Sequence, residues 1–177
     1  AHQHKMKDVK GPSGVLNRNE QRKLIADKVP EKRRANFLNP KPIEIRDVDP
    51  PDLFNPEPTS DKNFLWFKVD GTLDIKEQWI HHCFLAYASD VSLLGSGNRP
   101  HGVSAYSGDV MLASLDHAMW FHEKINFNDW YLYEMDSPFS GAARSLNRGK
   151  VFSQDGILVA SVAQEGLMRP LKRRPNT

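Results

Sequence analysis

Apolar and polar residues alternate in several short stretches of the chain, a pattern typical of half-buried β-strands. These stretches are residues 42–48, 64–69, 111–122, 130–135, 143–152 and 158–164. Turn-forming residues separate several of them, namely Pro50, Pro51, Pro56, Pro58, Asp70-Gly71 and Asp155-Gly156. The pattern therefore predicts a domain rich in strands, with short connections between most of them.

A longer stretch between the second and third strands has helical periodicity instead. Its predicted apolar face carries Trp79, Cys83, Ala86 and Leu94. Asp74 and Glu77 have the spacing of a helix-starting capping box, and Gly95 and Gly97 are suited to a left-handed helix end. We therefore expect a helix over about residues 75–94, some 30 Å long at about 1.5 Å per residue.

The predicted order is two strands, one long helix and then three or four strands. An antiparallel sheet in this order can curl around the helix and bury it on its concave face. This α+β arrangement is the hot-dog fold, which we predict for residues 41–170, with a cystatin-like or ferredoxin-like domain as the alternative. Residues 1–40 are expected to form a lead-in or linker, with short helices after Asn17 and over 31–37. Residues 171–177 are expected to form a flexible basic tail.

Composition narrows the class of protein. The 24 basic and 22 acidic residues give a net charge of +2, which does not favour nucleic-acid binding. The single cysteine, Cys83, excludes an internal disulfide, fits a reducing compartment and is expected to be packed. We expect no membrane span, because no apolar run approaches about 18 residues, and the N-terminus lacks a secretory signal pattern.

Three polar residues stand out because they interrupt apolar surroundings. Asp90 lies on the predicted apolar helix face, Ser114 within a strand, and Gln164 on a strand face with apolar neighbours. Each alone is compatible with a structural role. Together, a carboxylate, a hydroxyl and an amide are suited to hold one water for attack on an acyl carbon. A serine nucleophile is not indicated, because Ser114 lacks a Gly-x-Ser-x-Gly context.

The histidines do not predict a metal site. His81 and His82 point to different sides of a helix, and His117 and His122 fall on opposite faces of a continuous strand. A His-Glu-x-x-His motif and paired cysteines are both missing from the sequence, so we expect no metal. Residues 95–97 also lack the spacing and the lysine of a phosphate-binding loop.

Three stretches in series resemble the acyl-CoA thioesterase II family, the TesB-like group that includes peroxisomal acyl-CoA thioesterases of eukaryotes. They are LAYASDVSLLG at 85–95, ASLDHAMWFH at 113–122 and ASVAQEGLMR at 160–169. The resemblance extends from about Pro42 to Arg169. It implies a double hot-dog enzyme that hydrolyses acyl-CoA to free fatty acid and CoA, without a cofactor, metal or covalent intermediate.

The resemblance also implies roles for the three polar residues. The family's water-activating aspartate matches Asp90, its serine-or-threonine position matches Ser114, and its glutamine matches Gln164. Asp90 would act as general base or orient the water, with Ser114 and Gln164 fixing it against the thioester carbonyl. Backbone N–H groups at a helix N-terminus are suited to bind the developing oxyanion.

Length is a departure from the family pattern, because its members carry two hot-dogs and 177 residues hold one. Residues 1–6 resemble the junction after the first hot-dog, so the chain is expected to be the C-terminal half. We expect it to pair with the N-terminal half or with a second copy of itself as a homo-oligomer. The end, residues 174–177, is unlike a Ser-Lys-Leu signal, so we expect cytoplasmic placement, with the peroxisome as the alternative.

Two other functions remain open at this point. A 3-hydroxyacyl thioester dehydratase on the same fold would need a histidine with a carboxylate. Asp116 and His117 are the neighbouring pair, but adjacent strand residues point to opposite faces. A non-catalytic hot-dog that binds acyl-CoA or forms a dimer would show binding without turnover, and no special sensitivity at Asp90.

Overall fold

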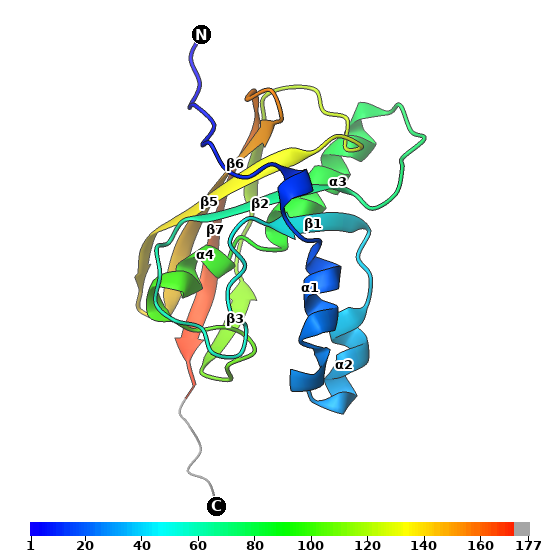
Figure 1. The fold of residues 1–177 in the computed structure, drawn as a ribbon. Helices are drawn as coiled ribbons and strands as arrows, with labels where there is room; N and C mark the ends of the chain where they lie inside the picture. Colours follow the sequence, from blue (N-terminus) through cyan, green and yellow to red (C-terminus); the bar gives the residue numbers. More distant parts are fainter. Residues whose placement is uncertain (172–177) are drawn as a thin grey trace, which may run out of the picture.

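The computed structural model describes residues 1–171, and in this part of the chain seven strands form one antiparallel sheet (Figure 1). The strands are β1 (Ile43–Asp47), β2 (Asn63–Val69), β3 (Val110–Ser114), β4 (Ala118–Phe121), β5 (Tyr131–Gly141), β6 (Arg144–Ser153) and β7 (Leu158–Pro170). Their order in the sheet is β1-β2-β5-β6-β7-β3, and β4 also pairs with β7. The long strand β7 therefore carries both β3 and β4 along one edge.

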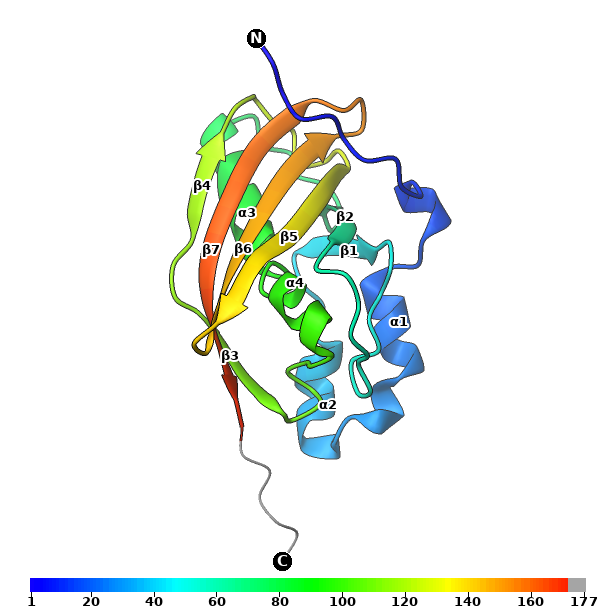
Figure 2. The ribbon, with the colours of Figure 1, turned by 90° about the vertical axis from the view of Figure 1, so that its left-hand side faces the viewer.

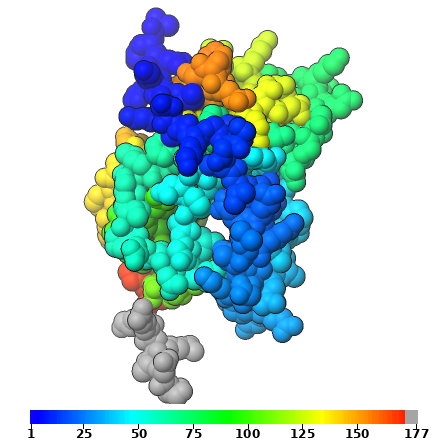
Figure 3. Space-filling model, viewed as in Figure 1, coloured from blue at the N-terminus to red at the C-terminus, as the bar shows by residue number. Residues whose placement is uncertain are grey.

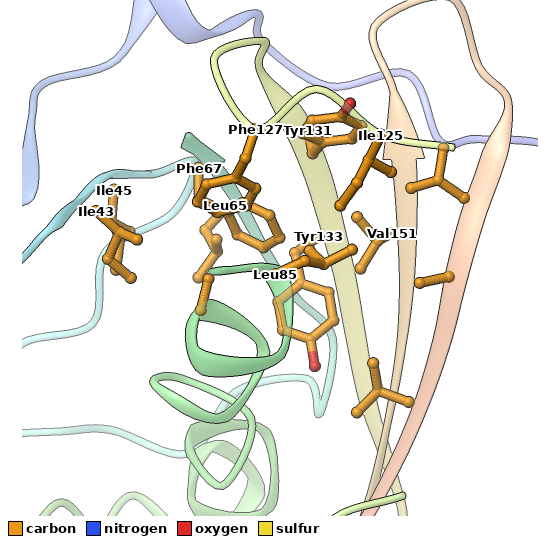
Figure 4. Close-up of a cluster of buried hydrophobic side chains, with 14 of the residues drawn as sticks. Ile43, Ile45, Leu65, Phe67, Leu85, Ile125, Phe127, Tyr131, Tyr133 and Val151 are labelled. Atoms are coloured by element: carbon orange, nitrogen blue, oxygen red, sulfur yellow. The ribbon is translucent and has the colours of Figure 1, made fainter. Parts of the chain in front are cut away.

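The sheet curls around helix α3 (Gln78–Asp90), as Figure 2 shows. Leu85 of α3 is 0% exposed and packs among Leu65, Phe67 and Tyr133 of the sheet (Figure 4). Burying a leucine side chain in this way contributes about 1.5–3 kcal/mol. The predicted hot-dog fold, with an antiparallel sheet around one helix, is confirmed.

The helix itself is shorter than the sequence predicted. It begins at Gln78 without a side-chain cap, so the predicted capping box of Asp74 and Glu77 does not form. It ends at Asp90, and a short second helix, α4 (Gly95–Asn98), starts where glycines were expected to end the first one. Gly95 and Gly97 therefore lie inside a helical turn, and the latter packs closely on Ser145 of β6.

The predicted buried face of the helix is also wrong. Trp79 is 65% exposed and Cys83 is exposed, whereas His81 is buried with Leu85. His81 fits the core because both ring nitrogens are partnered: Nε2 lies 2.8 Å from the carbonyl oxygen of Ile75, and Nδ1 accepts from the N–H of Phe127 at 3.1 Å. A buried polar side chain with its hydrogen bonds made costs little, and a hydropathy pattern cannot detect this.

The predicted strand over residues 111–122 is divided into β3 and β4. Ser114 pairs with Gly166 and Ala118 with Ala163, so three residues, 115–117, lie opposite two residues, 164–165, of β7. One extra residue on a strand is a β-bulge, which bends the strand and redirects side chains. The other predicted strands are confirmed within a few residues, although β5 and β7 are longer than expected.

The first 15 residues run along the outer face of the sheet, whereas the two helices that follow lie beside β1 on the α4 side (Figure 2). This N-terminal segment contains the helices α1 (Arg18–Leu24) and α2 (Glu31–Leu38), with 3-10 turns at Pro12–Gly14 and Ala26–Lys28. Elsewhere in the chain, one more 3-10 turn, Arg99–His101, follows α4. The capping box of Asn17 and Glu20 starts α1, as the sequence indicated. Met6, Val9 and Val15 pack on the sheet face opposite α3.

An ion pair joins α1 to the sheet, because the guanidinium of Arg18 contacts both carboxylate oxygens of Asp47 at the end of β1. Residues 172–177 of the expected basic tail lie outside the described residues. Among residues 1–171, we find no helix with the length and apolar character needed to cross a membrane.

Candidate active site

The structure brings together the three polar residues that the sequence selected. Asp90 is the last residue of α3, and its Oδ1 atom accepts two hydrogen bonds from the sheet. Ser114 Oγ donates at 3.1 Å and Gln164 Nε2 donates at 2.5 Å. Asp90 is exposed and does not lie on the buried helix face as predicted. Its two donors come from the neighbouring strands β3 and β7.

Strand pairing sets the positions of both donors. Ser114 ends β3 opposite Gly166 of β7, and Gln164 stands two residues earlier on β7. Gly166 lets the side chain of Leu94, just before α4, pack directly on β7, because an added Cβ atom would force this side chain to move. Gln164 is only 1% exposed, so its amide is held among protein groups, whereas the hydroxyl of Ser114 remains accessible. Hydrogen bonds to a carboxylate in such a place are stronger than neutral ones.

A fourth side chain, His117, reaches the site, although the strand pattern does not predict it. Its Nδ1 atom lies 3.2 Å from Gln164 Nε2, and its Nε2 atom lies 2.9 Å from Ser89 Oγ. Asp116 points elsewhere and accepts a hydrogen bond from the N–H of Glu165 at 2.7 Å. The neighbouring Asp116 and His117 therefore do not form the pair that a dehydratase would need. The bulge before β4 directs His117, and this is why an uninterrupted strand pattern missed it.

Tyr133 supports the end of α3 from beneath. Its hydroxyl donates to the backbone oxygen of Ser89 at 3.0 Å, one residue before Asp90. Burial raises the pKa of the Tyr133 hydroxyl well above its ordinary value, and the negative charge of Asp90 raises it further. Tyr133 therefore stays neutral and remains a hydrogen-bond donor.

A cavity of about 840 Å³ opens beside Asp90 and Ser114. It lies between α1, the proline-rich loop 49–59, α4 and β3, and Figure 3 shows the surface hollowed between that loop and the helices α1 and α2. Leu94, Leu112 and Val103 contribute apolar wall, and Arg22 contributes charge. Cavities of this size accept small-molecule ligands.

The remaining histidines are dispersed. His82 stacks on Phe121, with ring centroids 4.3 Å apart, and His122 Nε2 lies 2.9 Å from Ser161 Oγ. Within residues 1–171, no group of three or more histidine, cysteine, aspartate or glutamate side chains is placed to hold a metal ion. The chemistry that the arrangement itself offers is that of a carboxylate base with two fixed donors.

Comparisons with known proteins identify the family. A family model described as acyl-CoA thioesterase matches residues 39–167. The chain is 34% identical over 170 residues to acyl-CoA thioesterase 2 of Haemophilus influenzae, covering 95% of this chain and 58% of that protein. It is 40% identical over 128 residues to acyl-coenzyme A thioesterase 8 of Mus musculus, covering 72% of this chain and 39% of that one. The chain thus spans about half the length of the curated relatives it matches.

Solved structures agree in fold. The crystal structure of acyl-CoA thioesterase II TesB2 from Mycobacterium marinum has a TM-score of 0.72 and 34% identity, covering 97% of this chain and 58% of that one. A protein of unknown function with a hot-dog fold from Alicyclobacillus acidocaldarius has a TM-score of 0.61 at 16% identity, covering 97% and 57%, and supports the fold alone. On the family match and these relatives, the chain belongs to the acyl-CoA thioesterase family.

Proposed function

We propose that this chain hydrolyses fatty acyl-CoA to free fatty acid and CoA by direct attack of a water activated by Asp90, Ser114 and Gln164. The observation that carries the proposal is the convergence of a hydroxyl and an amide on one oxygen of Asp90, beside a cavity open to a ligand. Membership in the family and the names of the relatives support the substrate class.

In this mechanism Asp90 is the general base. Among the described residues, both hydrogen bonds to its carboxylate go to Oδ1, so Oδ2 is the atom that accepts a proton from the water. The water oxygen then bonds to the thioester carbon, and the C–S bond breaks as the tetrahedral intermediate collapses. The CoA thiolate leaves and takes the proton from Asp90. A thiolate is a good leaving group, so the mechanism needs no second catalytic carboxylate.

Two N–H groups in the first turn of α4 are already used and do not serve as oxyanion donors. The N–H groups of Gly95 and Ser96 already donate to the carbonyl oxygens of Ser92 and Leu93, at 3.1 and 3.2 Å. The other helix N-terminus near the core, at Gln78, lies at the far end of α3 from Asp90. The expectation of a helix N-terminus for this role therefore gains no support from α3 or from these two N–H groups of α4.

A second hot-dog domain would complete the site. Trp79 and Tyr87 of α3 are exposed, and so are Trp120 and Phe121 of β4. The stacking of His82 on Phe121 shows that β4 lies beside α3. Exposed apolar surface of this kind marks an interaction site. We infer that the second domain of a longer chain covers it, and that in the isolated chain a second copy does so. Covering α3 in this way would limit the access of bulk solvent near Asp90 and strengthen its electrostatic contacts.

Release of free CoA thiol from a medium-chain acyl-CoA tests the proposed activity. We expect Asp90→Asn to lower turnover by about 10²-fold or more, because the general base is lost. Asp8→Asn, at an exposed position in the N-terminal segment, is the matched control and keeps wild-type turnover. Equal turnover in the wild type and Asp90→Asn would exclude Asp90 as the base. Calorimetric binding of acyl-CoA without any turnover would instead identify a binding module.

A further inference from the structure

The β-bulge between β3 and β4 brings two polar side chains to the same side of the sheet edge. In an unbroken strand, Ser114 and His117 are three residues apart and would point to opposite faces. The extra residue among 115–117 changes this alternation. Ser114 consequently donates to Asp90, and His117 contacts Gln164, which is the second donor to Asp90. Bulges that redirect a side chain in this way are frequent beside active sites.

The hydrogen bonds around His117 assign its tautomer. The Ser89 hydroxyl has two other neighbours, the carbonyl oxygen of Ala86 at 2.9 Å and Met119 Sδ at 3.8 Å, and both can only accept. The single hydroxyl proton of Ser89 is therefore used, and its oxygen accepts from His117 Nε2–H at 2.9 Å. In a neutral imidazole this leaves Nδ1 without a proton, as an acceptor.

Gln164 is consequently held by two acceptors. One hydrogen of its amide nitrogen goes to Asp90 Oδ1 at 2.5 Å and the other to His117 Nδ1 at 3.2 Å. A reversed amide would place Oε1 against a carboxylate and a bare ring nitrogen, which repel it. On the other side, Oε1 of Gln164 is buried without a hydrogen-bond partner among the described residues, so nothing there fixes the amide. The orientation depends on the two acceptors.

We propose that His117 is a positioning residue, which holds the amide of Gln164 in the orientation that donates to Asp90. This role rests on the hydrolytic function proposed above. Both ring nitrogens of His117 are engaged with Ser89 and Gln164, so the residue acts through Gln164 and does not itself exchange a proton with the water. Loss of its Nδ1 acceptor leaves one N–H of a buried amide without a partner, and Asp90 is then the single group that orients the amide.

Two substitutions separate this role from a general packing role. In His117→Asn, the side-chain oxygen can occupy the position of Nδ1 and accept from Gln164. In His117→Gln, the longer amide reaches the position of Nε2 and the Nδ1 acceptor is lost. We expect His117→Asn to keep kcat within about threefold, and His117→Gln to lower kcat about tenfold with KM unchanged, the effect of losing one hydrogen bond in the transition state. Equal losses in both variants, or full activity in His117→Gln, would overturn the proposal.

Histidine ¹⁵N NMR on the 177-residue chain provides a test that does not depend on turnover. Long-range ¹H–¹⁵N correlations are expected to show His117 as the neutral Nε2–H tautomer, with its signals assigned by their loss in His117→Asn. Ser89→Ala removes the partner of Nε2 and is expected to shift the population toward the Nδ1–H form. An Nδ1–H tautomer in the wild type would refute the positioning role, even in an active enzyme. Absence of CoA release with the expected tautomer would contradict the proposed hydrolysis and leave the hydrogen-bond assignment standing.

Discussion

The close packing of Gly149 on Tyr133 leads to a prediction that links stability to the site. Gly149 is a buried residue of β6, and a Cβ atom added there would lie 2.5 Å from the Tyr133 hydroxyl oxygen and 2.6 Å from Cζ. Tyr133 is 0% exposed and packs against Phe67 in the core, so its ring cannot move out into solvent. Gly149→Ala therefore forces the ring out of place and breaks its hydrogen bond to Ser89, next to Asp90.

The size of the effect follows from three contributions. Overpacking of a core costs about 1–3 kcal/mol. The lost hydrogen bond of Tyr133 costs about 1 kcal/mol. Alanine also restricts the unfolded chain, which returns about 0.4–1 kcal/mol. We expect Gly149→Ala to lower the free energy of unfolding by about 1–3.5 kcal/mol in total. Turnover should also fall, because Ser89 holds His117 and precedes Asp90.

Gly11→Ala is the matched control, because no heavy atom lies within 4 Å of the added Cβ atom and the backbone φ is −65°. Gly11→Ala reduces the conformational entropy of the unfolded chain by the same amount, so it should leave the free energy of unfolding unchanged or raise it slightly. Urea unfolding followed by tryptophan fluorescence measures both variants, and CoA release is assayed where each is folded. If Gly149→Ala were as stable as Gly11→Ala, the inferred position of the Tyr133 ring would be refuted.

Three further predictions concern other parts of the fold. Ala143 in the β5–β6 turn has a φ of 61°, so Ala143→Gly should raise the free energy of unfolding by up to about 1 kcal/mol, and a loss of stability would contradict the turn geometry. Leu85→Ala should lower the free energy of unfolding, measured in urea, by about 2–5 kcal/mol. Cys83→Ala, at an exposed position on the same helix, should change it by no more than about 0.5 kcal/mol. Similar losses in both variants would contradict the orientation of α3. Because burial raises the pKa of Tyr133, its neutral form stabilises the fold below about pH 10, and this stability falls as pH rises through the folded-state pKa. Tyr133→Phe should therefore lose less stability than the wild type above about pH 10, and parallel losses in both proteins would refute this.

The sequence predicted the strands well because each carries a period-two pattern that reflects which face is buried. It failed on the orientation of α3. The apolar pattern places Trp79 in the core and gives no reason to bury His81. The structure exposes Trp79 and buries His81, because specific hydrogen bonds to Ile75 and Phe127 make a buried histidine inexpensive.

The same reasoning explains the outcome at the candidate site. Asp90, Ser114 and Gln164 were selected as polar residues in apolar surroundings, and they do lie together, although Asp90 is exposed at the helix end. His117 was excluded because a continuous strand places it away from its neighbours. Its actual direction depends on one extra residue in the pairing of β3 and β4 with β7, and strand register is a long-range property that local pattern does not specify.

A single-turnover reaction in H₂¹⁸O, with the chain in excess over a medium-chain acyl-CoA, tests the central claim most directly. Direct attack by a water held at Asp90 predicts one ¹⁸O atom in the carboxylate of the released fatty acid. It also predicts an unlabelled Asp90-containing peptide by mass spectrometry. Unlabelled fatty acid with ¹⁸O in the Asp90 peptide, or a trapped acyl–Asp90 adduct, would contradict the account and identify Asp90 as a nucleophile.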